Sequence, residues 1–559
     1  MTTVVRLYLG RDAEQLLDSP PFLREWAALY HACSWATCFQ DAPFVTTWYR
    51  CYAEDFEPVI VAGETDGRLS GLFTLATDKR SGALCAAGAH QAEYHVWLAL
   101  PGDGARFIEE ALDELSRVFP RGHLQLLFAP PKTPVEWTKR WSGRCYLRPI
   151  PKPLMVTRPA DSARESLRKK SNKSRLSRLE KEGPLNFAKI TGAEGFRAAL
   201  EVIGDLSDFR QGAVNGVLPF QADRHKKAFY IALLEQPGLM HVTVLRVGQQ
   251  IAAAHIGPCN REEVVLGILV HSPFFARHSC GKLHLLLLGL TLEQDGFRAL
   301  DLTPGGEFKE RFATRYDEAS VLDIFFSRSA VRAFRWKRAS IGFGKRFVST
   351  NRVKQALRMA RHKASLVRPR SILNRLLRPI RRFCYEHREY RVYRYAAEAV
   401  PQPVAKIMRR DCLPDLTLYM PAEAWQPPLD EFLREAAKRL EAGEHAYTFA
   451  QDGRLAHHGW LIERQQEAFI SEVSQKLRLP PDSAVLYDFY TRPEHRGKGF
   501  YQRALAQMTY DAAKVPGIRH IYIGALKENL ASCHAIEKAG FEHQQSLFET
   551  RRLGKIKRW

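Results

Sequence analysis

Glycine and basic residues stand together in the stretch TRPEHRGKGFYQRAL, which runs from Thr491 to Leu505. Its centre, Arg496 to Gly499, joins an apolar strand-like run to a helix-like segment. Glycine lets the backbone turn sharply and bring successive N–H groups toward one ligand, and the helix that follows adds free donors and the positive end of its dipole. The spacing matches neither the GxxxxGK[ST] phosphate loop nor the GxGxxG dinucleotide fingerprint. We therefore predict an anion-binding cradle from Arg496 to Tyr501, with an ordinary basic turn as the alternative.

The segments on both sides of this turn predict the elements that must hold it. Apolar residues at helical spacing, an apolar strand–turn–strand pattern and an apolar aromatic run follow one another along the chain. In chain order we expect a helix at 429–440, a hairpin that turns at Asp452-Gly453, a strand at 484–490, the glycine turn with its helix, a strand at 518–523 and a helix at 529–539. In the strand at 484–490, strict alternation puts Leu486, Asp488 and Tyr490 on one face and Val485, Tyr487 and Phe489 on the other.

This succession, together with NLASCHAIEKAGF from Asn529 to Phe541, resembles the GNAT acetyltransferase family, whose cofactor-binding signature is Q/R-x-x-G-x-G/A. Arg496 and Gly499 match its first and fourth positions, and Tyr501 replaces the last Gly or Ala. The resemblance implies acetyl-CoA as the acyl donor, with its pyrophosphate on the backbone amides of the cradle. The cofactor-binding residues expected on this basis are Thr491, Arg496, Gly497, Lys498, Gly499, Phe500, Tyr501 and Asn529. For Asn529 the alternative is a helix N-cap.

Acyl transfer to an amine or a hydroxyl needs a base and a proton donor. Many relatives carry a tyrosine acid seven residues after the asparagine, but Ile536 stands there in this chain. The catalytic candidates by position are Asp488 and Tyr490 on a shared strand face, Glu472 on the preceding strand-like segment, and Ser532 or Cys533 as proton donor. His457, His458 and Trp460 on the hairpin are candidates for an acceptor pocket, and strand positions without a role are the alternative.

The first 330 or so residues resemble the CelD-like acyltransferases, which are related to FemAB, have a tandem GNAT architecture and are associated with bacterial cellulose and exopolysaccharide clusters. The resemblance is carried by FQDAPFVTTWY, HSCGKLHLLLLGL and DLTPGGEFKERFATRY. A hairpin pattern also recurs from Val59, Val242 and Tyr447. Glu307 and Lys309 in the last motif are candidates for binding a substrate anion, or else form surface ion pairs.

We therefore expect an α/β protein of three GNAT-like units, with mixed, mostly antiparallel sheets flanked by helices. The expected parts are a tandem CelD/FemAB-like pair at 1–158 and 159–330, a basic connector at 331–390 and a C-terminal GNAT acetyltransferase domain at 391–559. The expected activity is acetyl-CoA-dependent N- or O-acyl transfer to a saccharide, a lipid-linked saccharide or another envelope precursor. The alternatives are a FemAB-like aminoacyl transferase that uses aminoacyl-tRNA, and a scaffold that binds a saccharide or a partner without catalysis.

Charge and cysteine usage bear on partners and compartment. The formal net charge is +22, and Val331 to Tyr390 contains eighteen Lys or Arg against two Glu. We interpret such a segment, interleaved with aromatic residues, as a solvated helical spacer; the alternatives are a surface that docks on anionic lipid or on RNA. The ten cysteines are dispersed without metal-ligand spacing, so no metal is expected. With no signal-like N-terminus, we expect a cytoplasmic protein, with peripheral attachment to the inner membrane surface as an option; the oligomeric state is left open.

Overall fold

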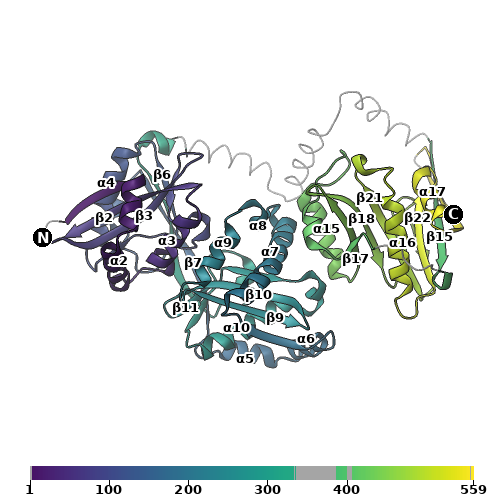
Figure 1. Cartoon of the computed structure of the whole chain (residues 1–559), viewed down its shortest axis with the longest axis horizontal. Helices are drawn as coiled ribbons and strands as arrows, with labels where there is room; N and C mark the ends of the chain where they lie inside the picture. The colour runs from purple at the N-terminus through teal and green to yellow at the C-terminus, as the bar shows by residue number, and fades with distance from the viewer. Residues whose placement is uncertain (1–2, 333, 335–384, 400–405, 554) are drawn as a thin grey trace. The chain divides into compact units, whose positions relative to one another are not determined.

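The computed structural model describes residues 3–332, 334, 385–399, 406–553 and 555–559. Nearly all of the basic connector therefore lies outside the described residues. The chain divides into two compact units, Met1–Gly204 with Asp223–Ser349 and Asp205–Ala222 with Thr350–Trp559 (Figure 1). Within the described part of the chain, no helix is both long enough and apolar enough to cross a bilayer.

The first unit contains two sheets. The five-stranded sheet has the order β1-β2-β3-β4 with β5 on β3, and the nine-stranded sheet has the order β6-β14-β7-β13-β11-β10-β9-β8 with β12 on β10. The strands are β1 (Thr3–Leu9), β2 (Phe56–Thr65), β3 (Arg68–Asp78), β4 (Leu84–Ala86), β5 (Leu98–Ala99), β6 (His123–Ala129), β7 (Cys145–Val156), β8 (Leu185–Lys189), β9 (Met240–Val247), β10 (Gln250–Asn260), β11 (Glu263–Val265), β12 (Ile268–His271), β13 (Ala299–Asp301) and β14 (Arg315–Phe325).

The helices of this unit lie between its strands in the sequence. They are α1 (Gly10–Leu17), α2 (Pro20–Ala32), α3 (Ala42–Cys51), α4 (Gly104–Val118), α5 (Asp161–Arg168), α6 (Lys170–Glu180), α9 (Lys226–Leu234) and α10 (Cys280–Gln294). Helix α7 (Ala193–Asn215) begins in the first unit and ends in the second, to which α8 (Pro219–Ala222) also belongs.

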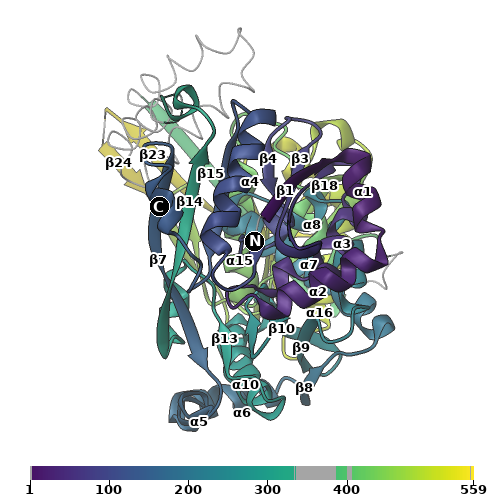
Figure 2. The same cartoon turned by 90° about the vertical axis from the view of Figure 1, so that its left-hand side faces the viewer.

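Strand pairing crosses the expected boundary at residue 158. Strands β6 and β7, which precede that boundary, both pair with β14, which lies far beyond it, and Figure 2 shows β7 and β14 as long neighbouring strands. The first half therefore forms the five-stranded sheet by itself and also contributes β6 and β7 to the nine-stranded sheet of the second half.

The second unit is one eight-stranded sheet, in the order β16-β17-β18-β21-β22-β15-β23-β24, with a small β19-β20 hairpin. The strands are β15 (Tyr385–Ala396), β16 (Arg409–Arg410), β17 (His445–Gln451), β18 (Arg454–Ile462), β19 (Glu467–Ile470), β20 (Gln475–Arg478), β21 (Ser483–Thr491), β22 (His520–Leu526), β23 (Glu542–Arg552) and β24 (Lys555–Arg558). The helices are α14 (Leu413–Thr417), α15 (Leu429–Glu441), α16 (Phe500–Ala513) and α17 (Leu530–Lys538). All neighbouring strands of the large sheet are antiparallel except β21 and β22.

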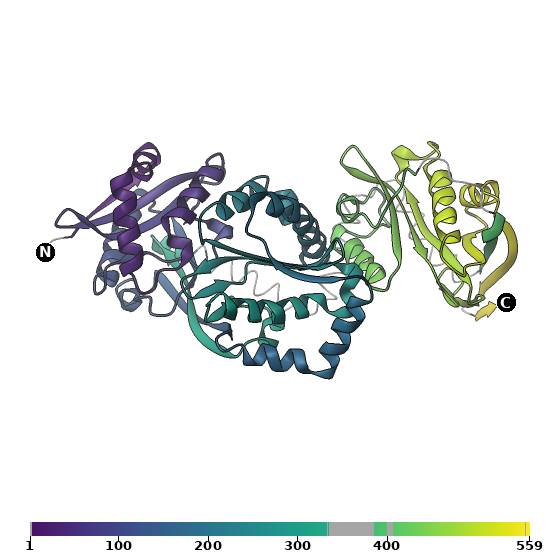
Figure 3. The ribbon, with the colours of Figure 1, turned by 60° about the horizontal axis from the view of Figure 1, so that its bottom comes forward.

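Helices cover both faces of this sheet. Helix α16 lies along one face (Figures 1 and 3), where Leu505 and Met508 are buried against Leu486 and Ile521. Helix α15 packs on β17 and β18 from the other face, where the Phe432 ring contacts His458. The mixed, mostly antiparallel sheets flanked by helices confirm the expected fold class, and the expected helix at 429–440 and strand at 484–490 are confirmed within a residue or two.

A β-bulge in β21 makes one part of the expected face assignment wrong. Between the pairs His458–Tyr490 and Trp460–Tyr487, β18 has one residue, Gly459, while β21 has two, Asp488 and Phe489. Asp488 is the extra residue and adopts a left-handed backbone with φ of 50°. Tyr490 therefore shares its face with Tyr487 instead of Leu486, and Phe489 lies on the opposite face beside Tyr501. The expectation that Asp488 and Tyr490 lie on the same side of the strand remains correct.

The same irregularity occurs in the nine-stranded sheet. Between the pairs Ile256–Ile268 and Cys259–Val264, β10 has two residues while the β11–β12 strand has three. Strand β11 then pairs in parallel with β13, as β21 does with β22. Ser279 before α10 and Gly499 before α16 both have left-handed backbones, with φ of 56° and 75°. The two segments thus have the same local construction, although β-hairpin sequences alone gave only weak evidence of it.

Candidate active site

The parallel strands β21 and β22 pair only near their beginnings. Their register runs from Ser483–His520 to Leu486–Ile523, and beyond it the two strands separate. A cavity of about 660 Å³ opens at this separation. The residues beyond the last pair that line it include Tyr487, Asp488 and Phe489 of β21, Gly524, Ala525 and Leu526 of β22, Tyr501 of α16, and Asn529 and Ser532 at the start of α17. We call this cavity the cleft.

The predicted cradle lies at the beginning of α16. Gly497 and Gly499 have φ values of 77° and 75°, a region that glycine adopts without the strain a side chain would cause. The backbone N–H groups from Gly497 to Gln502 have no hydrogen-bond acceptor among the described residues. A Cβ atom on Gly497 would meet nothing within 4 Å, so the surface beside these donors is open. The expected anion-binding geometry is therefore present in the backbone.

Not every predicted cofactor residue points its side chain at the cradle. The Arg496 guanidinium donates to the Thr491 carbonyl oxygen at 3.1 Å and pairs with the Glu423 carboxylate at 2.9 Å. Its side chain therefore stabilises the turn by binding protein groups. The Thr491 hydroxyl is 2.7 Å from Nδ1 of His457, and the Phe500 ring is buried in the core beneath α16. Lys498, by contrast, has no ion-pair partner within the described chain.

Asn529 fulfils its alternative interpretation as a helix cap. Its Oδ1 accepts a hydrogen bond of 3.2 Å from the Ser532 backbone N–H at the first turn of α17. The residue also lines the cleft, so a cap at this position is fully compatible with a contact to a bound cofactor. Asn529 is therefore a helix cap, and its position at the cleft also permits the predicted cofactor contact.

Of the five catalytic candidates, Asp488, Glu472 and Ser532 line the cleft, whereas Cys533 is buried and does not. The Asp488 carboxylate is ion-paired with Arg439 at 2.5 Å and its side chain is 48% exposed, which leaves room for a second partner. Glu472 does not lie on a strand as expected, because it is in the turn between β19 and β20. It nevertheless lines the cleft. Tyr490 does not line the cleft but a second cavity next to it.

Tyr501 is a site residue whose side-chain role the signature did not indicate. The signature has Gly or Ala at this position, so it assigns no role to a larger side chain. The Tyr501 ring lies 5.0 Å from that of Phe489 and lines the cleft, as Ser532 also does. Burial raises the pKa of Tyr501, so the hydroxyl keeps its proton at neutral pH. The unusual residue type at a Gly/Ala position was the available signal.

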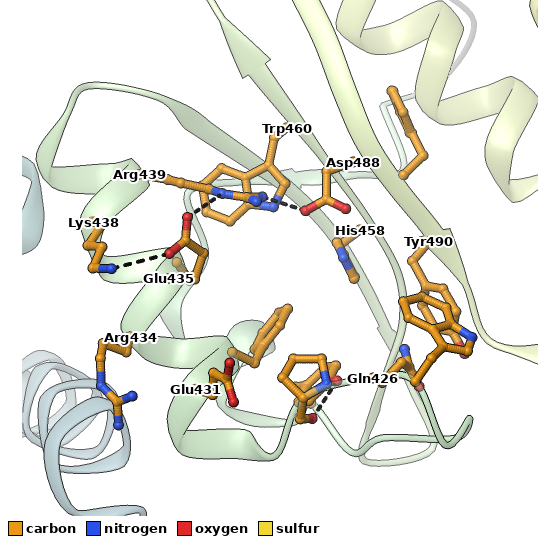
Figure 4. A pocket seen from close by; sticks show the side chains of 16 residues that line it. Gln426, Glu431, Arg434, Glu435, Lys438, Arg439, His458, Trp460, Asp488 and Tyr490 are labelled. Carbon is orange, nitrogen blue, oxygen red and sulfur yellow. Dashed lines mark hydrogen bonds and ion pairs between the residues drawn. The ribbon is translucent and has the colours of Figure 1, made fainter. Parts of the chain in front are cut away.

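The second cavity, of about 590 Å³, lies on the α15 face and is shown in Figure 4. We call it the Trp425 pocket. Glu435, Arg439, Asp488 and Phe489 line both this pocket and the cleft, so the two cavities adjoin. The remaining lining residues are Tyr419, Trp425, Gln426, Pro427, Glu431, Phe432, Arg434, Ala436, Lys438, His458, Trp460 and Tyr490. Sequence reasoning missed Trp425, because residues 418–428 show no periodic pattern.

The three hairpin candidates are divided between the faces of β18. His458 and Trp460 line the Trp425 pocket, and the Arg439 guanidinium lies over the Trp460 ring at 5.0 Å. His457 points to the other face, is fully buried and lines neither cavity. Burial lowers the pKa of His457 to about 3 and that of His458 to about 4, so both imidazoles are neutral at pH 7. The alternation of a strand explains why only one histidine of the pair reaches the pocket.

The candidates in the first unit lie beside a buried ionic network. Lys309 donates from Nζ to the carbonyl and hydroxyl oxygens of Thr303 at 3.1 and 2.7 Å, whereas Glu307 is exposed. Nearby, the Lys152 ammonium is 3.1 Å from the carboxylates of both Glu263 and Asp301. Burial acts to lower the pKa of Lys152, but these two carboxylates outweigh it and the pKa is raised. This network at the end of β13 was not anticipated from the sequence.

Two segments of the chain match family models, both described as an acetyltransferase (GNAT) domain, over residues 163–316 and 408–542. The chain contains two GNAT acetyltransferase domains. The cleft, the cradle and the Trp425 pocket all belong to the C-terminal GNAT domain. The bulge of the β11–β12 strand, its parallel pairing with β13 and helix α10 belong to the N-terminal GNAT domain. The third expected GNAT-like unit, at 1–158, stays a prediction.

Several solved structures are similar to the chain at low sequence identity. FemX is 9% identical, with 54% of this chain and 96% of FemX covered at a TM-score of 0.38. L-PGS from Bacillus licheniformis is 12% identical, with 55% and 92% covered at a TM-score of 0.36. A tandem GNAT protein from the clavulanic acid biosynthesis pathway is 13% identical, with 58% and 99% covered at a TM-score of 0.35. The comparison with curated proteins found no match.

Proposed function

We propose that the C-terminal GNAT domain transfers an acetyl group from acetyl-CoA to a nitrogen or oxygen atom of an acceptor held in the Trp425 pocket. The observation that carries this proposal is the separation of β21 from β22 directly beside a helix start with unpaired N–H groups. An acyltransferase must hold an anionic donor and an acceptor side by side, and the adjoining cradle, cleft and pocket supply three suitable compartments.

The residues present fit acetyl-CoA. The unpaired N–H groups from Gly497 to Gln502 and the free Lys498 ammonium suit a pyrophosphate group. The volume of the cleft, about 660 Å³, is within the range of roughly 300–1,000 Å³ usual for ligand pockets. Asn529 adds a side-chain amide at the cleft wall. When bound, acetyl-CoA supplies an acetyl group activated as a thioester.

The side chains of the cleft can manage the protons of acyl transfer. Asp488 faces both cavities, so its carboxylate can accept the proton that the acceptor's nitrogen or oxygen atom gives up. Arg439 forms an ion pair with this carboxylate and holds it in place between the two cavities. Glu472, on the opposite wall, is the second candidate base. Tyr501 and Ser532 both line the cleft, where their hydroxyl groups can act as proton donors.

The nature of the acceptor is a further part of the proposal. The resemblance of the first 330 or so residues to CelD-like proteins supports a saccharide, a lipid-linked saccharide or another envelope precursor. Transfer from acetyl-CoA and transfer from aminoacyl-tRNA differ in their donor, so donor binding is the step that separates them.

Isothermal titration calorimetry of the full chain with acetyl-CoA tests the donor site. We expect micromolar binding that is lost in Gly499→Glu, because the substitution places a carboxylate where the N–H groups must meet an anion and strains a left-handed backbone. Gly517→Glu is the matched control: it introduces the same residue at a φ of 81°, between the far end of α16 and β22.

The two variants separate loss of the site from loss of the fold. If Gly517→Glu binds like the wild type while Gly499→Glu does not, the cradle holds the donor. A folded wild-type chain that binds no acetyl-CoA would exclude the proposal and favour the aminoacyl or scaffold alternatives.

A further inference from the structure

The Trp425 pocket presents a large aromatic side chain to solvent on a fixed loop. Trp425 is 65% exposed, although its neighbour Gln426 is only 2% exposed. The Gln426 Oε1 accepts hydrogen bonds from the Ala422 and Glu423 N–H groups at 2.7 and 3.0 Å, and the Tyr419 hydroxyl donates to the Pro427 carbonyl at 2.9 Å. The loop is thus locked by its own polar groups, while the indole is left without a cover. An exposed tryptophan held in this way is suited to pack against a ligand.

Other aromatic rings extend this surface into the pocket. The Trp425 ring meets Tyr490 edge to face at 5.8 Å, and Tyr490 lies 5.8 Å from the His458 ring. Phe432 contacts His458 at 5.4 Å and stacks on Tyr419 at 3.8 Å. The wall therefore offers flat apolar area, which suits a rigid ring better than a flexible chain because a ring loses little conformational entropy on binding.

The charges of the pocket exclude two classes of acceptor. Each of its cations is paired: Arg434 with Asp430 at 3.2 Å, Lys438 with Glu435 at 3.5 Å, and Arg439 with Asp488 at 2.5 Å. No free cation among the lining residues is therefore available for a phosphorylated or carboxylated acceptor. Among the carboxylates that line the pocket, only that of Glu431 has no ion pair within the described chain, and one free carboxylate is too few for a linear polyamine, which carries several charges.

Polar groups without a protein partner also exclude a purely apolar acceptor. The Gln426 Nε2 group donates to no described residue, and neither ring nitrogen of His458 forms a hydrogen bond with one. With the Glu431 carboxylate, these groups offer a donor, an acceptor and a group that can do both. Covering them with hydrocarbon would leave them unsatisfied, whereas hydroxyl groups, which donate and accept, would satisfy them.

We propose that the Trp425 pocket binds an acceptor built on a saturated six-membered ring that carries hydroxyl groups and a single amine, such as an amino sugar or an aminocyclitol. The apolar C–H face of the ring would lie on Trp425, its hydroxyl groups would meet Gln426 and His458, and Glu431 would match its single positive charge. This inference rests on the proposed function only in naming the ring as the acceptor of the acyl group; binding of the ring is a separate property.

Binding is tested without donor by saturation-transfer NMR of the full chain with glucosamine. We expect transfer to the ring protons in the wild type and its loss in Trp425→Ala, with partial recovery in Trp425→Phe. Trp559→Ala is the matched control, because Trp559 is also highly exposed, at 51%, but lines neither cavity. Absence of transfer in the wild type, or equal transfer in Trp425→Ala, would overturn the inference even if acetyl-CoA binds.

Turnover gives the second measurement, followed as release of the CoA thiol. With glucosamine as acceptor, Trp425→Ala should raise KM about tenfold and change kcat little, because the contact positions the ring and does not take part in the chemistry. With cadaverine, a linear diamine, the wild type should be the poorer enzyme and the substitution should have no effect. Preference for cadaverine would overturn the inference and leave the proposed function intact. A third outcome separates the two proposals. If acetyl-CoA does not bind, but the wild type still shows NMR saturation transfer to glucosamine that is lost in Trp425→Ala, the inference is supported and the proposed function is rejected.

Discussion

Asp488 is one of four residues that line both the cleft and the Trp425 pocket, and its carboxylate forms an ion pair with Arg439. A carboxylate in contact with both cavities can accept a proton from an acceptor that reaches toward the donor.

The Asp488→Asn substitution removes that base while keeping the shape of the side chain. We expect kcat to fall by about 10²- to 10⁴-fold, the usual contribution of general-base catalysis, with acetyl-CoA affinity unchanged. Steady-state kinetics and calorimetry on the same preparation measure both quantities. Glu472→Gln is the comparison, and the assignment of the base would move to Glu472 if that variant alone were inactive.

Several site residues were predictable because their signals are local in the sequence. The glycines of the cradle and the helix cap at Asn529 depend on neighbours within a few positions, and both are in place. The roles of Tyr501 and Trp425 could not be deduced in the same way. The first depends on the packing of α16 against α17 and β21, and the second on a loop held by side-chain hydrogen bonds that follow no periodic pattern.

At the scale of elements, the bulge of β21 is made possible by the absence of a side chain on β18. A Cβ atom on Gly459 would lie 2.6 Å from the Phe489 ring, which covers the glycine on the α16 face. The order of helices and strands was predictable from apolar periodicity, but the bulge was not. It depends on the register between β18 and β21, and the sequence of either strand alone does not determine that register.

The Gly459→Ala substitution tests this packing. Overfilling the space should destabilise the unit by about 1–3 kcal/mol in urea-induced unfolding. Adding Phe489→Ala should remove most of that penalty. The double mutant should therefore be less destabilised than the sum of the two single mutants, which a double-mutant cycle measures as a coupling energy. Gly192→Ala, where an added Cβ would meet nothing within 4 Å, should change stability little and serves as the control. Equal effects of Gly459→Ala with and without Phe489 would contradict this account.

At the scale of the whole molecule, positive charge is concentrated in one part of the sequence. Residues 335–384 contain sixteen Lys or Arg and no Asp or Glu, and this segment lies outside the described residues. The sequence-based proposal that the segment docks on an anionic surface therefore depends on charge alone.

Cosedimentation of the full chain with lipid vesicles tests that proposal. We expect binding to vesicles that contain phosphatidylglycerol and none to pure phosphatidylcholine, since each basic residue near an anionic surface contributes roughly 1 kcal/mol. Binding should weaken as salt rises, because exposed charges are screened. The outcome that rejects a lipid partner is no binding to anionic vesicles at low salt, and salt-sensitive binding to an RNA homopolymer in the same assay would favour RNA.

The extra residue in β21 has a consequence for how such domains change over generations. Because Asp488 is the one residue by which β21 exceeds β18, a chain that lacked it would keep Phe489, Tyr490 and Thr491 on their present faces. A single in-frame codon thus distinguishes an evenly paired strand from one that carries a carboxylate between two cavities. If Asp488 is the base, deletion of that codon would remove the activity while leaving the pairing of the strand intact. The length of this strand in a related gene would then indicate whether the carboxylate is present.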